Sequence, residues 1–152
     1  MRIAVIDGQG GGIGKHITER IRKGLGPEVE IIALGTNSTA TSQMLRAGAN
    51  EGATGENAVV QTVAEVDVIT GPISILAANA MLGEVTPGMA VAIGNCKALK
   101  LLLPIGRSRI EIVGVQPEPL PHMVEKLVHL LVELNSPQKP NLNGGDHVVR
   151  TF

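Results

Sequence analysis

A short apolar run followed at once by a cluster of glycines constrains this chain more than any other feature. Residues 3–6 are apolar, and five glycines then fall within positions 8–14, with a lysine behind them. This pattern predicts a strand that leads through a loop without side-chain bulk into a helix, whose first N–H groups and dipole attract an anion. We therefore interpret the segment as a phosphate-binding loop made of Asp7, Gly8, Gln9, Gly10, Gly11, Gly12, Ile13, Gly14 and Lys15.

Three known glycine patterns compete for this loop. The dinucleotide fingerprint G-x-G-x-x-G fits Gly8 and Gly10, but Ile13 stands at the third glycine. The spacing G-x-x-x-G-x-G is satisfied by Gly8, Gly12 and Gly14, and resembles the glycine motif of short-chain dehydrogenases. The loop thus predicts NADP or NAD as cofactor.

The third pattern is the deviant phosphate loop of MinD-type ATPases, which residues 11–15 resemble. That pattern needs a lysine where Gly10 stands and a serine or threonine where His16 stands, so ATP is the less favoured ligand. A tight strand-to-helix turn that binds nothing is the structural alternative to all three.

Apolar runs rich in β-branched residues alternate with helical patterns along the chain. The runs lie at residues 3–6, 29–34, 66–70, 100–103 and 110–115, and further helices are expected at 73–82 and 121–134. This alternation predicts an α/β protein with a three-layer Rossmann-like fold and a mostly parallel sheet of about five strands. We expect one domain over residues 1–135 and a polar, flexible tail over residues 136–152.

Ligands of parallel α/β sheets bind where strands end, so the residues that follow the strands complete the predicted site. They are Thr36, Asn37, Ser38, Gly71, Pro72, Ser74 and Arg107. An NAD site usually has an acid after the second strand, and residues 34–38 offer only neutral groups, which makes NAD doubtful and permits NADP. No metal-ligand spacing occurs in the sequence.

Composition excludes several function classes. The net charge is −1 and Phe152 is the only Phe, Trp or Tyr, so nucleic acid is not an expected partner. No apolar stretch approaches the roughly 20 residues that a membrane helix needs. The single Cys96 and the short first apolar run predict a cytoplasmic protein without an internal disulfide.

The last helical pattern, residues 121–134, carries more apolar residues than one core-facing stripe needs. We interpret the excess as a surface for a homodimer or higher homo-oligomer. Burial of the helix between the sheet and loops is the alternative.

Several separated segments resemble a family of small bacterial proteins catalogued as a domain of unknown function (number 3842). The resemblance lies in residues 6–14, 33–37, 47–57, 71–73, 81–84 and 118–122, and it extends from residue 1 to about residue 134. It implies a small Rossmann-like protein and carries no established activity.

Three hypotheses for the function follow. The first is a protein that binds a nucleotide or phosphorylated metabolite through the glycine loop, as a sensor or regulator. The second is a small oligomeric enzyme that uses NAD(P), with His122 or Glu118 transferring a proton. The chain has no tyrosine, so it lacks the catalytic pair of short-chain dehydrogenases. The third is an interaction module whose glycine loop is purely structural.

Overall fold

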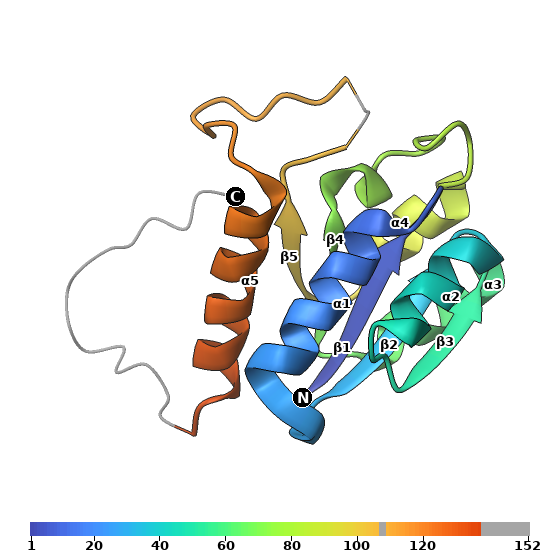
Figure 1. The fold of residues 1–152 in the computed structure, drawn as a ribbon. Coiled ribbons are helices and arrows are strands. Elements are labelled where there is room, and N and C mark those ends of the chain that lie inside the picture. The colour runs from blue at the N-terminus through green and yellow to red at the C-terminus, as the bar shows by residue number, and fades with distance from the viewer. Residues whose placement is uncertain (107–108, 138–152) are drawn as a thin grey trace.

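The computed structural model describes residues 1–106 and 109–137. Within these residues, five strands and five α-helices follow one another, and the strands run in one direction (Figure 1). The elements are β1 (Arg2–Asp7), α1 (Gly12–Leu25), β2 (Glu30–Gly35), α2 (Ser38–Arg46), β3 (Glu51–Thr54), α3 (Glu56–Thr62), β4 (Val68–Pro72), α4 (Pro87–Asn95), β5 (Leu99–Leu103) and α5 (Leu120–Asn135). Short 3-10 helices lie at Gly26–Glu28, Val63–Glu65 and Ile73–Leu76.

The sheet is parallel and its strand order is β3-β2-β1-β4-β5. The chain winds from β1 outward to β2 and β3, then returns to the other side of β1 with β4 and β5. Asp7 at the end of β1 lies beside Gly35 of β2, while Val5 lies beside Thr70 of β4. A parallel sheet wound in both directions opens a crevice where the winding reverses, here at the carboxyl ends of β1 and β4.

Each face of the sheet packs against its own layer of helices. On one face, alternate residues of β1 such as Ile3 and Val5 meet α1, α2 and α5. On the other, Ala4 and Ile6 meet α3, α4 and the 3-10 helices at Val63–Glu65 and Ile73–Leu76. The two central strands are therefore apolar on both sides, as expected of a covered parallel sheet. The predicted three-layer Rossmann-like α/β fold is confirmed.

Two sequence-based predictions of individual elements are wrong. The sequence predicts a strand at residues 110–115, but these residues form no strand and Val113 is 99% exposed. The strand that the prediction misses is β3. The predicted helix at 73–82 is only the four-residue 3-10 helix Ile73–Leu76, followed by turns. β3 has the sequence Glu-Gly-Ala-Thr, and it is a strand because its backbone continues the parallel ladder from β2 rather than because of strand propensity.

The last helix, α5, packs on the sheet and α1 (Figure 1), and it also keeps part of its apolar surface in solvent. Val124, Leu127 and Leu131 are buried, whereas Leu130 and Leu134 are 42% and 44% exposed. The inner stripe therefore belongs to the core. Self-association through the outer residues stays a prediction.

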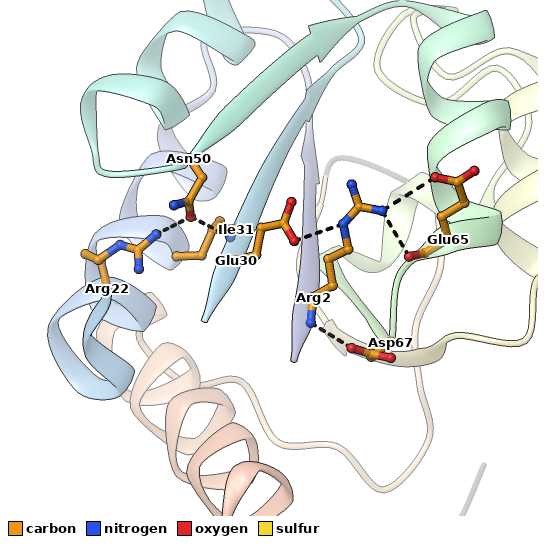
Figure 2. Close-up of polar contacts among 7 residues, drawn as sticks. All are labelled: Arg2, Arg22, Glu30, Ile31, Asn50, Glu65 and Asp67. Carbon is orange, nitrogen blue, oxygen red and sulfur yellow. Dashed lines mark hydrogen bonds and ion pairs between the residues drawn. The ribbon is translucent and has the colours of Figure 1, made fainter. Parts of the chain in front are cut away.

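The loops at the amino end of the sheet are tied together by the side chain of Arg2 (Figure 2). Its guanidinium donates to the carboxylate of Glu30 at 3.1 Å and to the carbonyl oxygen of Glu65 at 3.3 Å. Its backbone N–H donates to Asp67 Oδ2 at 2.7 Å. One residue thus links β1 to β2 and to the segment before β4.

A second arginine, Arg22 of α1, fills a similar role a short distance away (Figure 2). Its guanidinium donates to the carbonyl oxygens of Gly26, Val29 and Gly48 at 2.7, 3.0 and 3.0 Å. It also donates to Asn50 Oδ1 at 2.5 Å, and the same oxygen accepts from the N–H of Ile31 at 2.8 Å. The loops before β2 and β3 are therefore held by one half-buried side chain.

None of the helices in the described part of the chain has the length and hydropathy that a membrane span requires. The polar tail predicted at 136–152 lies outside the described residues from 138 onward, so the predicted domain boundary stays a prediction.

Candidate functional site

The loop between β1 and α1 is held at both ends by one buried carboxylate. Asp7 is the last residue of β1 and is 3% exposed. Its Oδ1 accepts the N–H of Gly8 at 2.8 Å, and its Oδ2 accepts the N–H of Gly14, in the first turn of α1, at 2.6 Å. The carboxylate thereby fixes the loop against the helix start.

Opposing effects act on the pKa of Asp7. Burial raises the pKa, because it penalises the charged form, and the nearby charge of Glu84 acts in the same direction. The backbone N–H groups of Gly14, Gly8 and Ile13 lower it, because they stabilise the carboxylate. Burial dominates, so the pKa of Asp7 lies above its usual value of 3.8.

The loop glycines fall into two groups by what surrounds them. A Cβ added at Gly8 would lie 2.6 Å from Met81 Sδ, and one at Gly14 would lie 2.6 Å from Met44 Sδ. Packing therefore favours a glycine at both, most strongly at Gly14, where Asp7 Cβ would also lie 2.8 Å from the added atom. At Gly10 and Gly12 a Cβ would meet nothing within 4 Å, and neither residue has a positive φ. The fold itself gives no reason for glycine at these two positions.

The same two residues carry free backbone donors. Within the described ranges, neither the N–H of Gly10 nor that of Gly12 has a hydrogen-bond acceptor. The N–H of Gly11 between them donates to the carbonyl oxygen of Gly8 at 2.9 Å, which closes a turn. Free N–H groups at the start of a 14-residue helix form an electropositive surface suited to an anion.

A cleft of about 730 Å³ opens directly over this loop. One wall is the loop itself, and the opposite wall comes from the segments after β4 and β5 and from the start of α5. The lining residues are Asp7, Gly8, Gln9, Gly10, Gly11, Gly12, Ile13, Pro72, Ser74, Met81, Gly106 and Leu120. The cleft thus lies at the carboxyl ends of β1 and β4, where the topology places a ligand site.

Next to the end of β2, the carboxylate of Glu84, from a segment distant in sequence, covers the carboxyl edge of the sheet. Glu84 Oε1 accepts the N–H of Gln9 at 3.0 Å, the hydroxyl of Thr36 at 2.7 Å and the side-chain amide of Asn37 at 2.6 Å. Burial alone would raise the pKa of Glu84, but these three donors outweigh it and lower the pKa below its usual value of 4.5. Glu84 is therefore held ionised beside the loop.

Most of the predicted loop residues line the cleft, together with Pro72 and Ser74 after β4. Gly14 is buried behind the loop, and Lys15 is exposed outside the cleft lining. Gly71 is a packing position, because an added Cβ would collide with the backbone of Ile6.

The predicted residues after β2 have local roles in the structure. Thr36 and Asn37 bind Glu84, and Asn37 also caps α2 by accepting the N–H of Ala40 at 2.9 Å. Ser38 is the first residue of that helix. Arg107 lies outside the described residues. Direct contact of any of these four with a ligand stays a prediction.

The two predicted proton-transfer residues do not join the cleft. Glu118 and His122 line a separate shallow depression on the outer side of α5, with Lys126 and His129 nearby. Glu118 forms an ion pair with Lys126. Leu120, which lies between them in sequence, is the residue of this segment that lines the cleft.

The sequence-based site does not include Met81, Gly106 and Leu120, and it gives no partners for Glu84. Glu84 interrupts an apolar region, which makes it a candidate buried or cleft polar group, but its partners lie up to 75 residues away. The other three are apolar or glycine and carry no local signal. Among the described residues, no cluster of His, Cys, Asp or Glu side chains could hold a metal ion.

The fold and the glycine loop together define a small Rossmann-like α/β protein. Its family is shown by sequence, because the profile of the domain of unknown function DUF3842 matches residues 2–136. The chain therefore belongs to the DUF3842 family. No curated protein matches the chain.

One solved structure with similarity to the chain is the dodecameric FMN-dependent UbiX-like decarboxylase from Escherichia coli O157:H7. The sequence identity is 14% and the TM-score is 0.46, over 95% of this chain and 100% of that one.

Proposed function

We propose that this protein binds a small phosphate-bearing ligand, a nucleotide or a phosphorylated metabolite, in the cleft between β1 and β4. The phosphate lies on the backbone N–H groups of Gly10 and Gly12, at the positive end of the α1 dipole. The body of the ligand lies against Ile13, Pro72 and Leu120.

The observation that carries this proposal is the contrast between the two groups of loop glycines. Gly8 and Gly14 are explained by packing inside the protein, whereas Gly10 and Gly12 face open space in the cleft. A close approach of ligand to backbone explains glycine there, since any Cβ would lie in the path of the phosphate. A purely structural loop leaves these two glycines and their free N–H groups unexplained.

Two alternatives receive less support from the geometry. An enzyme that uses His122 or Glu118 for proton transfer needs these groups near the ligand, and they lie in a different depression. An interaction module would bind a partner through α5 and would leave the cleft empty. The interaction module predicts that blocking the cleft leaves partner binding at α5 unchanged, whereas the NAD(P)-dependent enzyme predicts that it abolishes turnover.

The proposal is tested by calorimetric titration with inorganic phosphate, ribose 5-phosphate, AMP, FMN, NAD(H), NADP(H), and ATP or GTP with and without magnesium. For a ligand that binds, Gly12→Val places a branched side chain over the free N–H groups. We expect the affinity to fall by about a hundredfold or more, the scale on which lost charge-assisted hydrogen bonds act.

The matched control is Gly94→Val in α4, where an added Cβ also meets nothing within 4 Å and the cleft is not involved. This variant should bind as the wild type does. If no phosphate-bearing compound in the panel binds, the loop is structural and the proposal is wrong. Unchanged affinity in folded Gly12→Val would remove the phosphate from this loop.

A further inference from the structure

The segment between the 3-10 helix at Ile73–Leu76 and α4 is folded tightly upon itself. The N–H of Asn79 donates to the carbonyl oxygen of Val85 at 2.7 Å. The N–H of Val85 donates to the carbonyl oxygen of Ala80 at 3.1 Å. Gly83 and Glu84 donate to the carbonyl oxygens of Asn79 and Met81 at 3.0 and 3.2 Å. We call residues 77–85 the edge cap.

Three residues of the edge cap other than glycine have left-handed backbone conformations. The φ angles are 65° at Asn79, 56° at Met81 and 57° at Leu82. Such conformations are costly for residues with side chains and persist only where the surroundings enforce them. The internal hydrogen bonds provide that enforcement, so the edge cap is a fixed block.

The edge cap is fastened to the carboxyl edge of the sheet over the ends of β1 and β2. Glu84 Oε1 accepts hydrogen bonds from Gln9, Thr36 and Asn37, which belong to the loops after those two strands. Met81 lies against Gly8, close enough that a Cβ on that glycine would collide with its sulfur. The position directly after β2 is therefore filled by the protein itself.

In folds that bind dinucleotides, the position after the second strand holds a ribose, whose hydroxyl is bound by an acidic residue. Here the carboxylate of Glu84 occupies that place, and one of its two oxygens, Oε1, is already engaged by three protein donors. The remaining opening is the cleft toward β4 and α5, bounded by Pro72, Ser74 and Leu120.

Resting on the proposed function, we propose that the edge cap restricts the cleft to phosphate monoesters that carry a single sugar or nucleoside. Glu84 determines this specificity. A mononucleotide or a sugar phosphate fits the β4 side of the loop with its phosphate on Gly10 and Gly12. A pyrophosphate-linked dinucleotide needs the β2 side as well, which the edge cap covers.

The test compares matched pairs in which the smaller compound is one half of the larger one, namely nicotinamide mononucleotide against NAD and FMN against FAD. Ribose 5-phosphate and AMP separate a sugar phosphate from a nucleotide as the source of the monoester. For the pair that binds, we expect the monoester to bind at least about tenfold more tightly than the dinucleotide. If ribose 5-phosphate or AMP binds while nicotinamide mononucleotide and FMN do not, NAD and FAD should also fail to bind.

Variants then test whether Glu84 sets this ratio. Glu84→Ala releases the edge cap, and dinucleotide affinity relative to the monoester should rise about fivefold or more. Glu84→Gln keeps an acceptor of the same size and should stay nearer the wild type. The control, Glu30→Ala, removes a hydrogen-bonded glutamate at the amino edge and should leave the ratio unchanged.

The outcomes separate the two proposals. If the wild type binds NAD or FAD as tightly as the corresponding monoester, the proposed function stands and the restriction to monoesters is wrong. An unchanged ratio in Glu84→Ala overturns the role of Glu84. No binding by any phosphate compound overturns the proposed function and the restriction together.

Discussion

The two edges of the sheet are built on opposite principles. At the amino edge, Arg2 donates hydrogen bonds to the carboxylate of Glu30 and to Glu65 (Figure 2), and Arg22 donates to the carbonyl oxygens of Gly26 and Val29. At the carboxyl edge, the acids Asp7 and Glu84 accept backbone N–H groups, and within the described residues those of Gly10 and Gly12 stay free. The amino edge uses these polar groups in hydrogen bonds within the protein, whereas the carboxyl edge leaves two N–H groups open to a ligand.

This difference follows from the direction of parallel strands. Each strand delivers the chain to the carboxyl edge, where it turns into a helix start with unpaired N–H groups. The amino edge collects helix ends, whose free carbonyl oxygens are satisfied by cationic side chains such as Arg22. We therefore expect the contacts at the amino edge to stabilise the fold and the groups at the carboxyl edge to bind the ligand.

The largest effect on stability is expected from breaking the amino edge at Arg22. Arg22→Met keeps the aliphatic stem and removes hydrogen bonds to Gly26, Val29, Gly48 and Asn50. We expect a loss of about 3 kcal/mol in the free energy of unfolding, measured by urea denaturation, because several carbonyl oxygens lose their donors.

The control for this comparison is Arg20→Met. Arg20 lies on the same helix and makes an exposed ion pair with Glu125, which should contribute less than about 1 kcal/mol. Ligand affinity should not change in either variant. Equal stability losses in the two would show that the amino edge is not the stabilising one.

A smaller loss of stability, combined with a loss of binding, is expected from Asp7→Asn at the carboxyl edge. An amide can accept one N–H group but presents a donor to the other, so either Gly8 or Gly14 loses its acceptor. We expect a loss of about 2 kcal/mol in the free energy of unfolding. Ligand affinity should fall as well, because the loop is no longer fixed to α1.

The pH dependence of this variant carries a defined sign. Because the pKa of Asp7 is raised in the folded state, its contribution to stability is present in full below 3.8 and is lost as pH rises through the raised pKa. The stability deficit of Asp7→Asn should therefore shrink over that window and level off above it. A deficit that grows with pH would mean that the N–H groups outweigh burial.

The smallest effect on stability is expected away from both edges, at Leu130 of α5. This side chain is 42% exposed, so Leu130→Lys should change the free energy of unfolding by less than about 0.5 kcal/mol. If α5 is the self-association surface, sedimentation should show a shift toward monomer. Val91→Lys, at a 60% exposed position of α4, should show none.

The sequence predicts the layered fold well where periodicity and glycine act locally. The runs that form β1, β2 and β4 are largely apolar and buried or half-buried, that of β5 is half-buried after the exposed Leu99, and Thr86 caps α4 by accepting the N–H of Met89 at 3.1 Å. β3 escapes prediction because its four residues have no strand character and depend on pairing with β2. Residues 110–115 mislead because β-branched residues also occur in exposed connections.

The site is predictable only in part, for a related reason. The glycine loop is contiguous, so its pattern can be recognised in one segment. The distinction between Gly8 and Gly10 cannot, because it depends on the sulfur of Met81, and that contact spans 73 positions of sequence. The edge cap is missed since left-handed Met81 and Leu82 follow no propensity and require the hydrogen bonds of the folded turn.

The aliphatic character of the cleft has a spectroscopic consequence. Its apolar walls come from Ile13, Pro72, Met81 and Leu120, and the chain contains neither tryptophan nor tyrosine. A fluorescent ligand bound there has no electron-rich indole or phenol of this chain to stack on and quench its emission. The polarization of this emission, rather than a loss of intensity, therefore reports occupancy, against a protein that contributes almost no fluorescence of its own.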